Sequence, residues 1–177
     1  DSDHRRGVEV GAEVGRQHMR KPWSPRGICT LLLFTSLWVL RWPVGAQEIF
    51  TLPTRAGVTQ SYLLANVPVH RQAIALLFPG GNGYFRLRME VSQVTYDSNN
   101  FLVRSRDEFV KRNVVTAVIE AASDSQTSVG MSDQTRLGNE HVADIQAVIA
   151  ALTKQFPNIP VYLVGTSRGT VSAASIG

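Results

Sequence analysis

A serine between two glycines near the end of the chain has the residue types of a catalytic nucleophile. The segment reads Gly165-Thr166-Ser167-Arg168-Gly169, and it lies between the apolar run 160–164 and a small-residue stretch, 170–174. This order predicts a sharp strand-to-helix turn, where side chains at Gly165 and Gly169 would collide. Ser167 Oγ would project above the sheet. The N–H of Arg168, at a helix start, would face an oxygen that becomes negative in acyl transfer. The alternative is a turn whose serine only caps the helix.

A glycine loop earlier in the chain offers more backbone donors. Residues 79–83 read Pro-Gly-Gly-Asn-Gly and follow the apolar run Ala73–Phe78. An oxyanion needs two N–H groups that converge on one point, and glycine lets the backbone approach a substrate closely. We expect Gly81 to supply the second donor, with Gly80 and Asn82 as register alternatives. The loop lacks the Lys-Ser/Thr ending of a P-loop and the three-glycine spacing of a dinucleotide site, whereas a simple turn is the other interpretation.

Alternating strands and helices are expected to position these two loops. Short β-rich or continuously apolar runs predict strands, and apolar residues at helical spacing predict helices. The expected strands are 48–52, 58–64, Ala73–Phe78, Val114–Ile119 and 160–164; the expected helices are about 101–112, capped within 98–100 and stopped at Asn113, and about 139–156. The first two strands form an antiparallel hairpin, and right-handed βαβ crossovers then make a parallel sheet covered on both faces. The prediction is an α/β fold with an antiparallel start and a long polar loop over 121–135.

The first 46 residues have the pattern of a leader. From Met19 a basic region precedes a thirteen-residue apolar core, 28–40, and a small-residue stop before Gln47. This is the order of a secretory signal peptide over 19–46, and its core is shorter than a membrane-spanning helix. An uncleaved anchor and a buried helix are the alternatives. Met19 is the expected start, with 1–18 as upstream translation or a disordered extension. We therefore expect an exported protein, periplasmic or secreted, with no stable membrane span after cleavage.

Charge and cysteine content exclude several partners. The net charge is +4, but the leader holds seven basic residues against four acidic ones, and the rest holds eleven against ten. No basic run interleaved with aromatics occurs in the exported part, so nucleic acid is not an expected partner. The single cysteine, Cys29, excludes a disulfide framework and a cysteine-based zinc site. We expect no cofactor and no metal.

The order of elements and the two loops resemble the first half of an α/β-hydrolase domain, with the glycine loop in place of the HGGG-type motif. The chain is more closely similar to a group of exported bacterial α/β hydrolases without a defined substrate. That likeness rests on the segments NFLVRSR at 100–106, ASD at 122–124 and VGTSRGT at 164–170, and it covers residues 47–177. The resemblance implies a serine hydrolase acting on a small-molecule ester or related acyl bond.

In this family the remaining triad members follow the serine, in the order Asp or Glu and then His. Only ten residues follow Ser167. We therefore expect a partial α/β-hydrolase domain over 47–177, without the acid, the histidine or the C-terminal strands, and with little or no turnover as it stands. The third apolar strand, 160–164, would leave an open edge. A non-catalytic binding protein that keeps the fold is the alternative.

Upstream residues are weak substitutes for the missing triad members. We expect His141 to be an exposed or capping residue, while His70 precedes a strand at the opposite end of the sheet, and His4 and His18 lie in the leader. Asp124 follows a buried strand, at the edge where open α/β sheets build their sites, so it has either a direct or a loop-ordering role. The arginines of the first helix and the preceding loop are expected to be solvated or salt-bridged; they are Arg86, Arg88, Arg104 and Arg106. Substrate identity and oligomeric state stay open.

Overall fold

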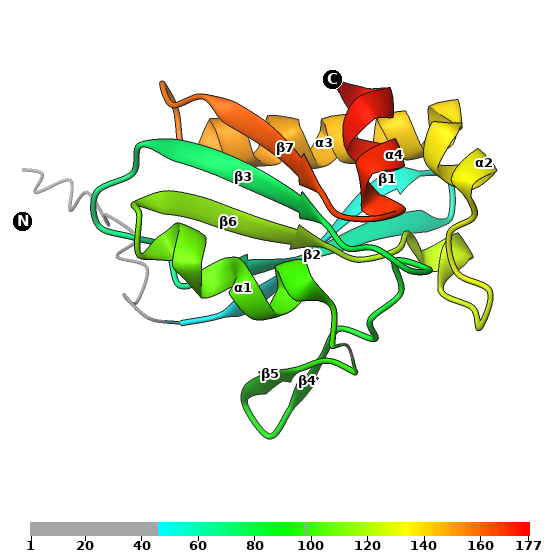
Figure 1. The fold of residues 1–177 in the computed structure, drawn as a ribbon, viewed down its shortest axis with the longest axis horizontal. Coiled ribbons are helices and arrows are strands. Elements are labelled where there is room, and N and C mark those ends of the chain that lie inside the picture. The colour runs from blue at the N-terminus through cyan, green and yellow to red at the C-terminus, as the bar shows by residue number, and fades with distance from the viewer. Residues whose placement is uncertain (1–45, 98) are drawn as a thin grey trace, which may run out of the picture. The chain divides into compact units, whose positions relative to one another are not determined.

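Five strands form one mixed sheet at the centre of the molecule (Figure 1). The computed structural model describes residues 46–97 and 99–177, which belong to one compact unit. The expected signal peptide, apart from Ala46, and the residues before it lie outside the described residues. The strand order is β1-β2-β6-β3-β7. The strands are β1 Glu48–Arg55, β2 Val58–Ala65, β3 Ala73–Phe78, β6 Val114–Ile119 and β7 Val161–Gly165.

The sheet changes from antiparallel to parallel at β6. β1 pairs with β2 and β2 with β6 in antiparallel register, whereas β6, β3 and β7 run parallel. The first hairpin is longer than expected, because β1 continues past a register shift at Pro53 to Arg55 and turns at Gly57, whose φ is +73°. The predicted α/β fold with an antiparallel start is confirmed.

Helices cover both faces of the sheet, as expected. The helices are α1 Phe101–Val110, α2 Asp133–Leu137, α3 Asn139–Gln155 and α4 Gly169–Ile176, with a 3₁₀ turn at Ser123–Ser125. On one face, Leu102 and Val103 of α1 pack on Leu77 and Val118. On the other face lie α3 and α4, whose apolar side chains join a second cluster with the alternate residues of the same strands.

The first helix buries Leu102, Val103 and Arg106. Asn100 caps it, since its side chain accepts a hydrogen bond from the Leu102 N–H, and Asn113 ends it with φ +63°; Ser98 lies outside the described residues. Phe101 is 61% exposed, while Arg106 is buried. The Arg106 guanidinium donates to the Val103 carbonyl (2.6 Å) and the Tyr96 hydroxyl (2.9 Å). Its Nε lies 4.0 Å from the Asp107 carboxylate, so this arginine is salt-bridged as expected, although its side chain is buried.

Two short elements were missed. A hairpin of β4 Arg88–Glu90 and β5 Gln93–Thr95 projects from the body below α1 (Figure 1), and α2 begins within the segment predicted as a long loop and continues past its end to Leu137. The hairpin turns through Val91 and Ser92 at φ +45° and +67°, where glycine or asparagine is the usual signal. In α2, Ser132 is the N-cap, and its hydroxyl accepts a hydrogen bond from the Thr135 N–H (3.0 Å).

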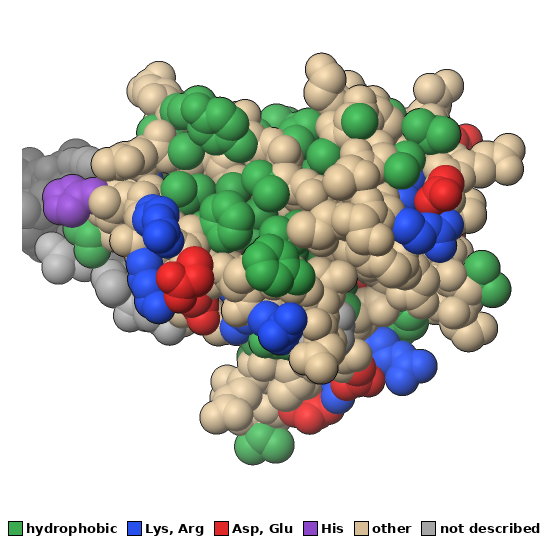
Figure 2. Space-filling view, in the orientation of Figure 1, with side chains coloured by type: hydrophobic (Ala, Val, Ile, Leu, Met, Phe, Trp, Pro, Cys, Tyr) green, Lys and Arg blue, Asp and Glu red, His purple; other side chains and the backbone are tan. Residues whose placement is uncertain are grey.

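The α1 side of the sheet keeps an apolar surface beside the last strand. Figure 2 shows hydrophobic side chains gathered on this face, and Tyr162 of β7 is 58% exposed. Within the described residues, β7 pairs with β3 alone and lies at the edge of the sheet. No helix in this part of the chain is long and apolar enough to cross a membrane.

Candidate active site

Ser167 occupies the turn between β7 and α4 in a left-handed backbone conformation. Its φ is +50°, and it is exposed. Three backbone hydrogen bonds hold the turn: Gly169 N–H to Thr166 O (2.8 Å), Thr170 N–H to Ser167 O (3.0 Å) and Thr166 N–H to Phe78 O (3.3 Å). A non-glycine residue with this φ costs about 1–2 kcal/mol, so the surrounding contacts must impose it. The turn presents one serine side chain at the carboxyl end of the parallel strands.

The two glycines that flank this turn have no room for a side chain. A Cβ on Gly165 would lie 2.4 Å from the Gly169 carbonyl oxygen, and a Cβ on Gly169 would come within 2.0 Å of the Phe78 carbonyl oxygen. Both distances are far below any real contact, and both partners are backbone atoms. The close approach of β7, α4 and the end of β3 therefore requires glycine at both positions.

The glycine loop, residues 79–83, lies against the serine turn. Gly80 is buried, and a Cβ there would be 3.0 Å from Ser167 Cβ and 2.9 Å from the Thr166 carbonyl oxygen. Gly81 is exposed with φ +65°. The N–H groups of Gly81 and Arg168 donate to no acceptor in the described part of the chain. The glycine loop and the serine turn thus each carry an unused backbone donor, and Gly80 brings the two segments into contact.

Asn82 stabilises the glycine loop through its own hydrogen bonds. Its side-chain oxygen accepts from the Tyr84 N–H (3.2 Å) and its carbonyl from the Met131 N–H (2.8 Å). A Cβ on Gly130 would come within 2.5 Å of the Asn82 carbonyl oxygen. Asn82 therefore joins the glycine loop to the segment that leads into α2.

Glu120 binds the backbone of the segment that follows the glycine loop, and it was not among the residues predicted from the sequence. This buried carboxylate, directly after β6, accepts hydrogen bonds from the N–H groups of Phe85 (2.9 Å), Leu87 (2.8 Å) and Ala121 (2.9 Å). Burial raises the pKa of Glu120 above its ordinary value, against the opposing effect of the three backbone donors. Its signal in the sequence was a single acid that ends a continuously apolar strand.

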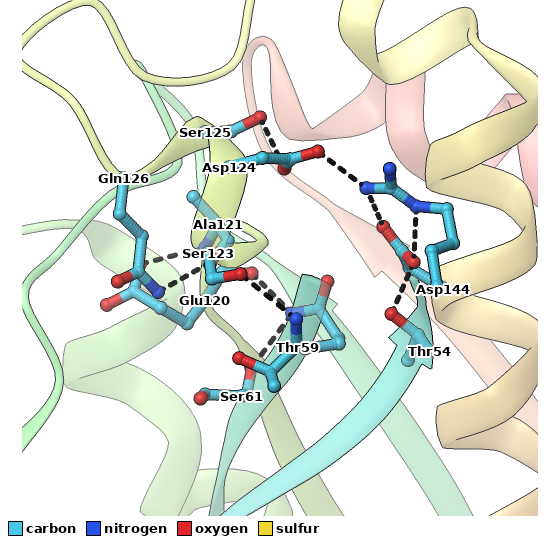
Figure 3. Close-up of polar contacts among 12 residues, drawn as sticks. Thr54, Thr59, Ser61, Glu120, Ala121, Ser123, Asp124, Ser125, Gln126 and Asp144 are labelled. Atoms are coloured by element: carbon cyan, nitrogen blue, oxygen red, sulfur yellow. Dashed lines mark hydrogen bonds and ion pairs between the residues drawn. The ribbon is translucent and has the colours of Figure 1, made fainter. Parts of the chain in front are cut away.

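Asp124 belongs to a polar cluster with Asp144 and Thr54 (Figure 3). Arg55 donates to Asp124 (2.8 Å) and twice to the buried Asp144 (both 2.9 Å), and Asp144 also accepts from the Thr54 hydroxyl. These bonds, chiefly the one to Asp144, raise the pKa of the Arg55 guanidinium. Arg55, Asp124 and Asp144 line a cavity of about 300 Å³ to which Ser167 does not contribute. Asp124 thus ties its loop to β1 and α3, which favours its loop-ordering role.

His141 is buried, and the expectation of an exposed or capping residue was wrong. It is 3% exposed, packs edge-on against Phe78 (6.3 Å between ring centres), and neither ring nitrogen has a hydrogen-bond partner among the described residues. Burial and the nearby positive charge of Arg136 lower the pKa of His141 to about 4. The cause is α2, which packs against the start of α3 and covers a position that would otherwise face solvent.

The other candidate residues lie away from Ser167. His70 is exposed just before β3, at the opposite end of the parallel strands. Arg86 and Arg88 both pair with Asp97, as expected of salt-bridged surface arginines. Within residues 46–97 and 99–177, no group of three or more His, Cys, Asp or Glu side chains could hold a metal ion.

Solved structures share this fold. A cold-adapted esterase from an Arctic intertidal metagenomic library has a TM-score of 0.51 at 15% identity, over 73% of this chain and 54% of the esterase. The chain thus shares its α/β fold with part of that esterase. DcsB, solved in complex with its substrate analogue, matches with a TM-score of 0.51 at 16% identity, over 73% of this chain and 40% of DcsB. The chain therefore spans about half or less of each structure. No family model matches it, and no curated protein matches its sequence.

Proposed function

We propose that this protein is a serine hydrolase that cleaves an ester or related acyl bond, with Ser167 as its nucleophile. The observation that carries the proposal is the φ of +50° at a serine held between two glycines that cannot be replaced without collision. Such strain in a non-glycine residue persists where the surrounding structure imposes it, and it is common at reacting groups. The shared fold with an esterase supports the same reaction class.

The chemistry follows from the groups around the hydroxyl. Ser167 Oγ would attack the acyl carbon while a base takes its proton, and the carbonyl oxygen would become an anion. The N–H groups of Arg168 and Gly81 would donate to that oxygen, and the N-terminal end of α4 would add its dipole. Collapse would expel the alcohol with the proton returned to it, and water would then hydrolyse the acyl-serine.

The base and its acid partner would come from residues other than those described. His141 is neutral at pH 7, enclosed, and outside any contact with Ser167, and His70 is at the far end of the strands. We propose that a carboxylate and a histidine follow residue 177 in the complete protein, as the fold resemblance implies, so that the 177-residue chain alone reacts slowly. An oxyanion site without a base still accelerates reactions measurably over water.

A non-catalytic binding protein is the second candidate. The specific observation in its favour is that Ser167 Oγ contacts no histidine and no carboxylate among the described residues. Such a protein would keep the turn and the glycine loop for packing, or to bind a carboxylate or carbonyl without cleaving it.

A fluorophosphonate probe separates the two candidates, because it labels only an activated serine. We expect the protein extended by its natural C-terminal continuation to label, and Ser167→Ala to abolish labelling. Ser128→Ala, an exposed serine in the loop before α2, is the matched control and should label like the wild type. A folded, extended protein that takes no label would favour the binding protein. Labelling that persists in Ser167→Ala would refute Ser167 as the nucleophile.

A further inference from the structure

Arg136 of α2 is a fully buried arginine that pairs with no carboxylate in the described part of the chain. Arg136 is 2% exposed, and its Nε has no hydrogen-bond partner among the described residues. Burial, and then the positive charge of Arg168, lower the pKa of Arg136. A buried cation without an anionic partner destabilises the folded state, and an apolar side chain of similar volume would commonly be more stable. Its presence therefore requires another explanation than stability.

The polar contacts of Arg136 join the two halves of the candidate site. Nη1 donates to the buried Ser172 hydroxyl (2.8 Å) in α4, the helix that begins at the serine turn. Nη2 lies near the carbonyl oxygens of Pro79 (3.5 Å) and Gly81 (3.4 Å) in the glycine loop. The backbone takes part too, since the Ser175 hydroxyl donates to the Arg136 carbonyl (2.8 Å). In Figure 1, α2 lies beside α4, as these contacts require.

The loop is shaped around this guanidinium. A Cβ on Gly83, whose φ is +71°, would lie 2.6 Å from Nη2, so a side chain there would displace the guanidinium from its present position. In a trans peptide the carbonyl and the following N–H point in opposite directions. Because the Pro79 and Gly81 carbonyls face Arg136, the N–H groups of Gly80 and Asn82 are turned away from it. One side chain thus orients the two peptide planes on either side of the plane that carries the Gly81 N–H.

We propose that Arg136 is a positioning residue that holds the glycine loop in a fixed orientation against the nucleophile helix, so that the backbone donors of the oxyanion site converge. This inference rests on the proposed function. Donor direction matters most where charge develops in the transition state, so the effect belongs to the chemical step and not to substrate binding. A side chain that only filled space would affect stability alone.

The test is steady-state hydrolysis of p-nitrophenyl acetate by the extended protein, together with thermal unfolding. We expect Arg136→Met to lower kcat at least about tenfold with KM within about twofold, since it removes the orienting contacts and not a donor to the substrate. Arg136→Lys, which keeps the charge and one donor, should recover part of the loss. Ser172→Ala should lower kcat by less than Arg136→Met. Arg104→Met, an exposed arginine on α1, is the control and should leave kcat unchanged.

The possible outcomes distinguish failure of the positioning role of Arg136 from failure of the proposed hydrolase function. Wild-type kcat in a folded Arg136→Met, with only its melting temperature changed, overturns the positioning role and leaves the hydrolase intact. If Arg136→Met does not fold, wild-type kcat values in both Arg136→Lys and Ser172→Ala would likewise overturn the positioning role. Turnover that survives Ser167→Ala overturns the proposed function and this inference with it.

Discussion

Protonation of His141 should destabilise this protein in acid, and replacing that residue should remove this contribution. The imidazole is buried against Phe78 with the positive charge of Arg136 nearby, and neither ring nitrogen has a hydrogen-bond partner among the described residues. In the unfolded chain the same group titrates with a pKa near 6.5. The folded state therefore excludes a proton that the unfolded chain accepts.

The sign and size follow from that difference. The pKa of His141 falls from 6.5 to about 4 on folding, so its contribution to stability is complete above pH 6.5 and is lost as the pH falls toward 4. At about 1.4 kcal/mol per pH unit, the loss is on the order of 3 kcal/mol. Glu120 acts in the opposite sense, because its raised pKa favours the folded state as the pH falls. The comparison must therefore be between variants and not between pH values alone.

Urea unfolding at a series of pH values between 4 and 7 measures this difference. His141→Phe preserves the packing against Phe78, so wild type should lose about 3 kcal/mol more than the variant between pH 7 and 4. His70→Gln is the matched control, because His70 is exposed, and it should follow the wild type. Equal pH profiles for wild type and His141→Phe would refute the argument that His141 is a buried, neutral group and would reopen it as a candidate base.

Three further predictions concern the turns and the leader. Gly169→Ala should destabilise the folded state by more than about 3 kcal/mol, because the new Cβ would collide with the Phe78 carbonyl. Gly81→Ala faces open space and should cost about 1 kcal/mol, because its φ is positive. Equal urea midpoints for the two variants would contradict this difference. Val91→Asn should stabilise the protein by roughly 1 kcal/mol, because Val91 is fully exposed at φ +45°, and an unchanged midpoint would count against strain there. Mass spectrometry of the protein exported by a bacterial host should find Gln47 at its N-terminus, and an uncleaved leader would contradict the signal peptide.

Local patterns predicted the framework of the fold. The continuously apolar runs coincide with β3 and β6, and the 139–156 helix differs from α3 by one residue. The helix stop at Asn113 was predicted as well, because an asparagine in a left-handed conformation is a local stop signal. These elements are determined by neighbours in the chain, which is the information that a single sequence carries.

The environment of buried polar groups could not be predicted in the same way. His141 lies near the start of a helix and has the sequence neighbours of a surface residue; only the packing of α2 encloses it. Arg136 looks like any basic residue in a polar loop, and its partners, Ser172, Pro79 and Gly81, lie far from it in the chain. The β4–β5 hairpin has three-residue strands and a valine at its turn, so it lacked a local signal.

The position of the reacting serine is the central claim, and locating a covalent adduct tests it most directly. The extended protein would be treated with a fluorophosphonate, digested, and its peptides sequenced by tandem mass spectrometry. The strained turn, the free donors of Gly81 and Arg168 and the close-packed glycines predict a single adduct on Ser167. An adduct on another residue, or none on a protein shown to be folded, would contradict the account.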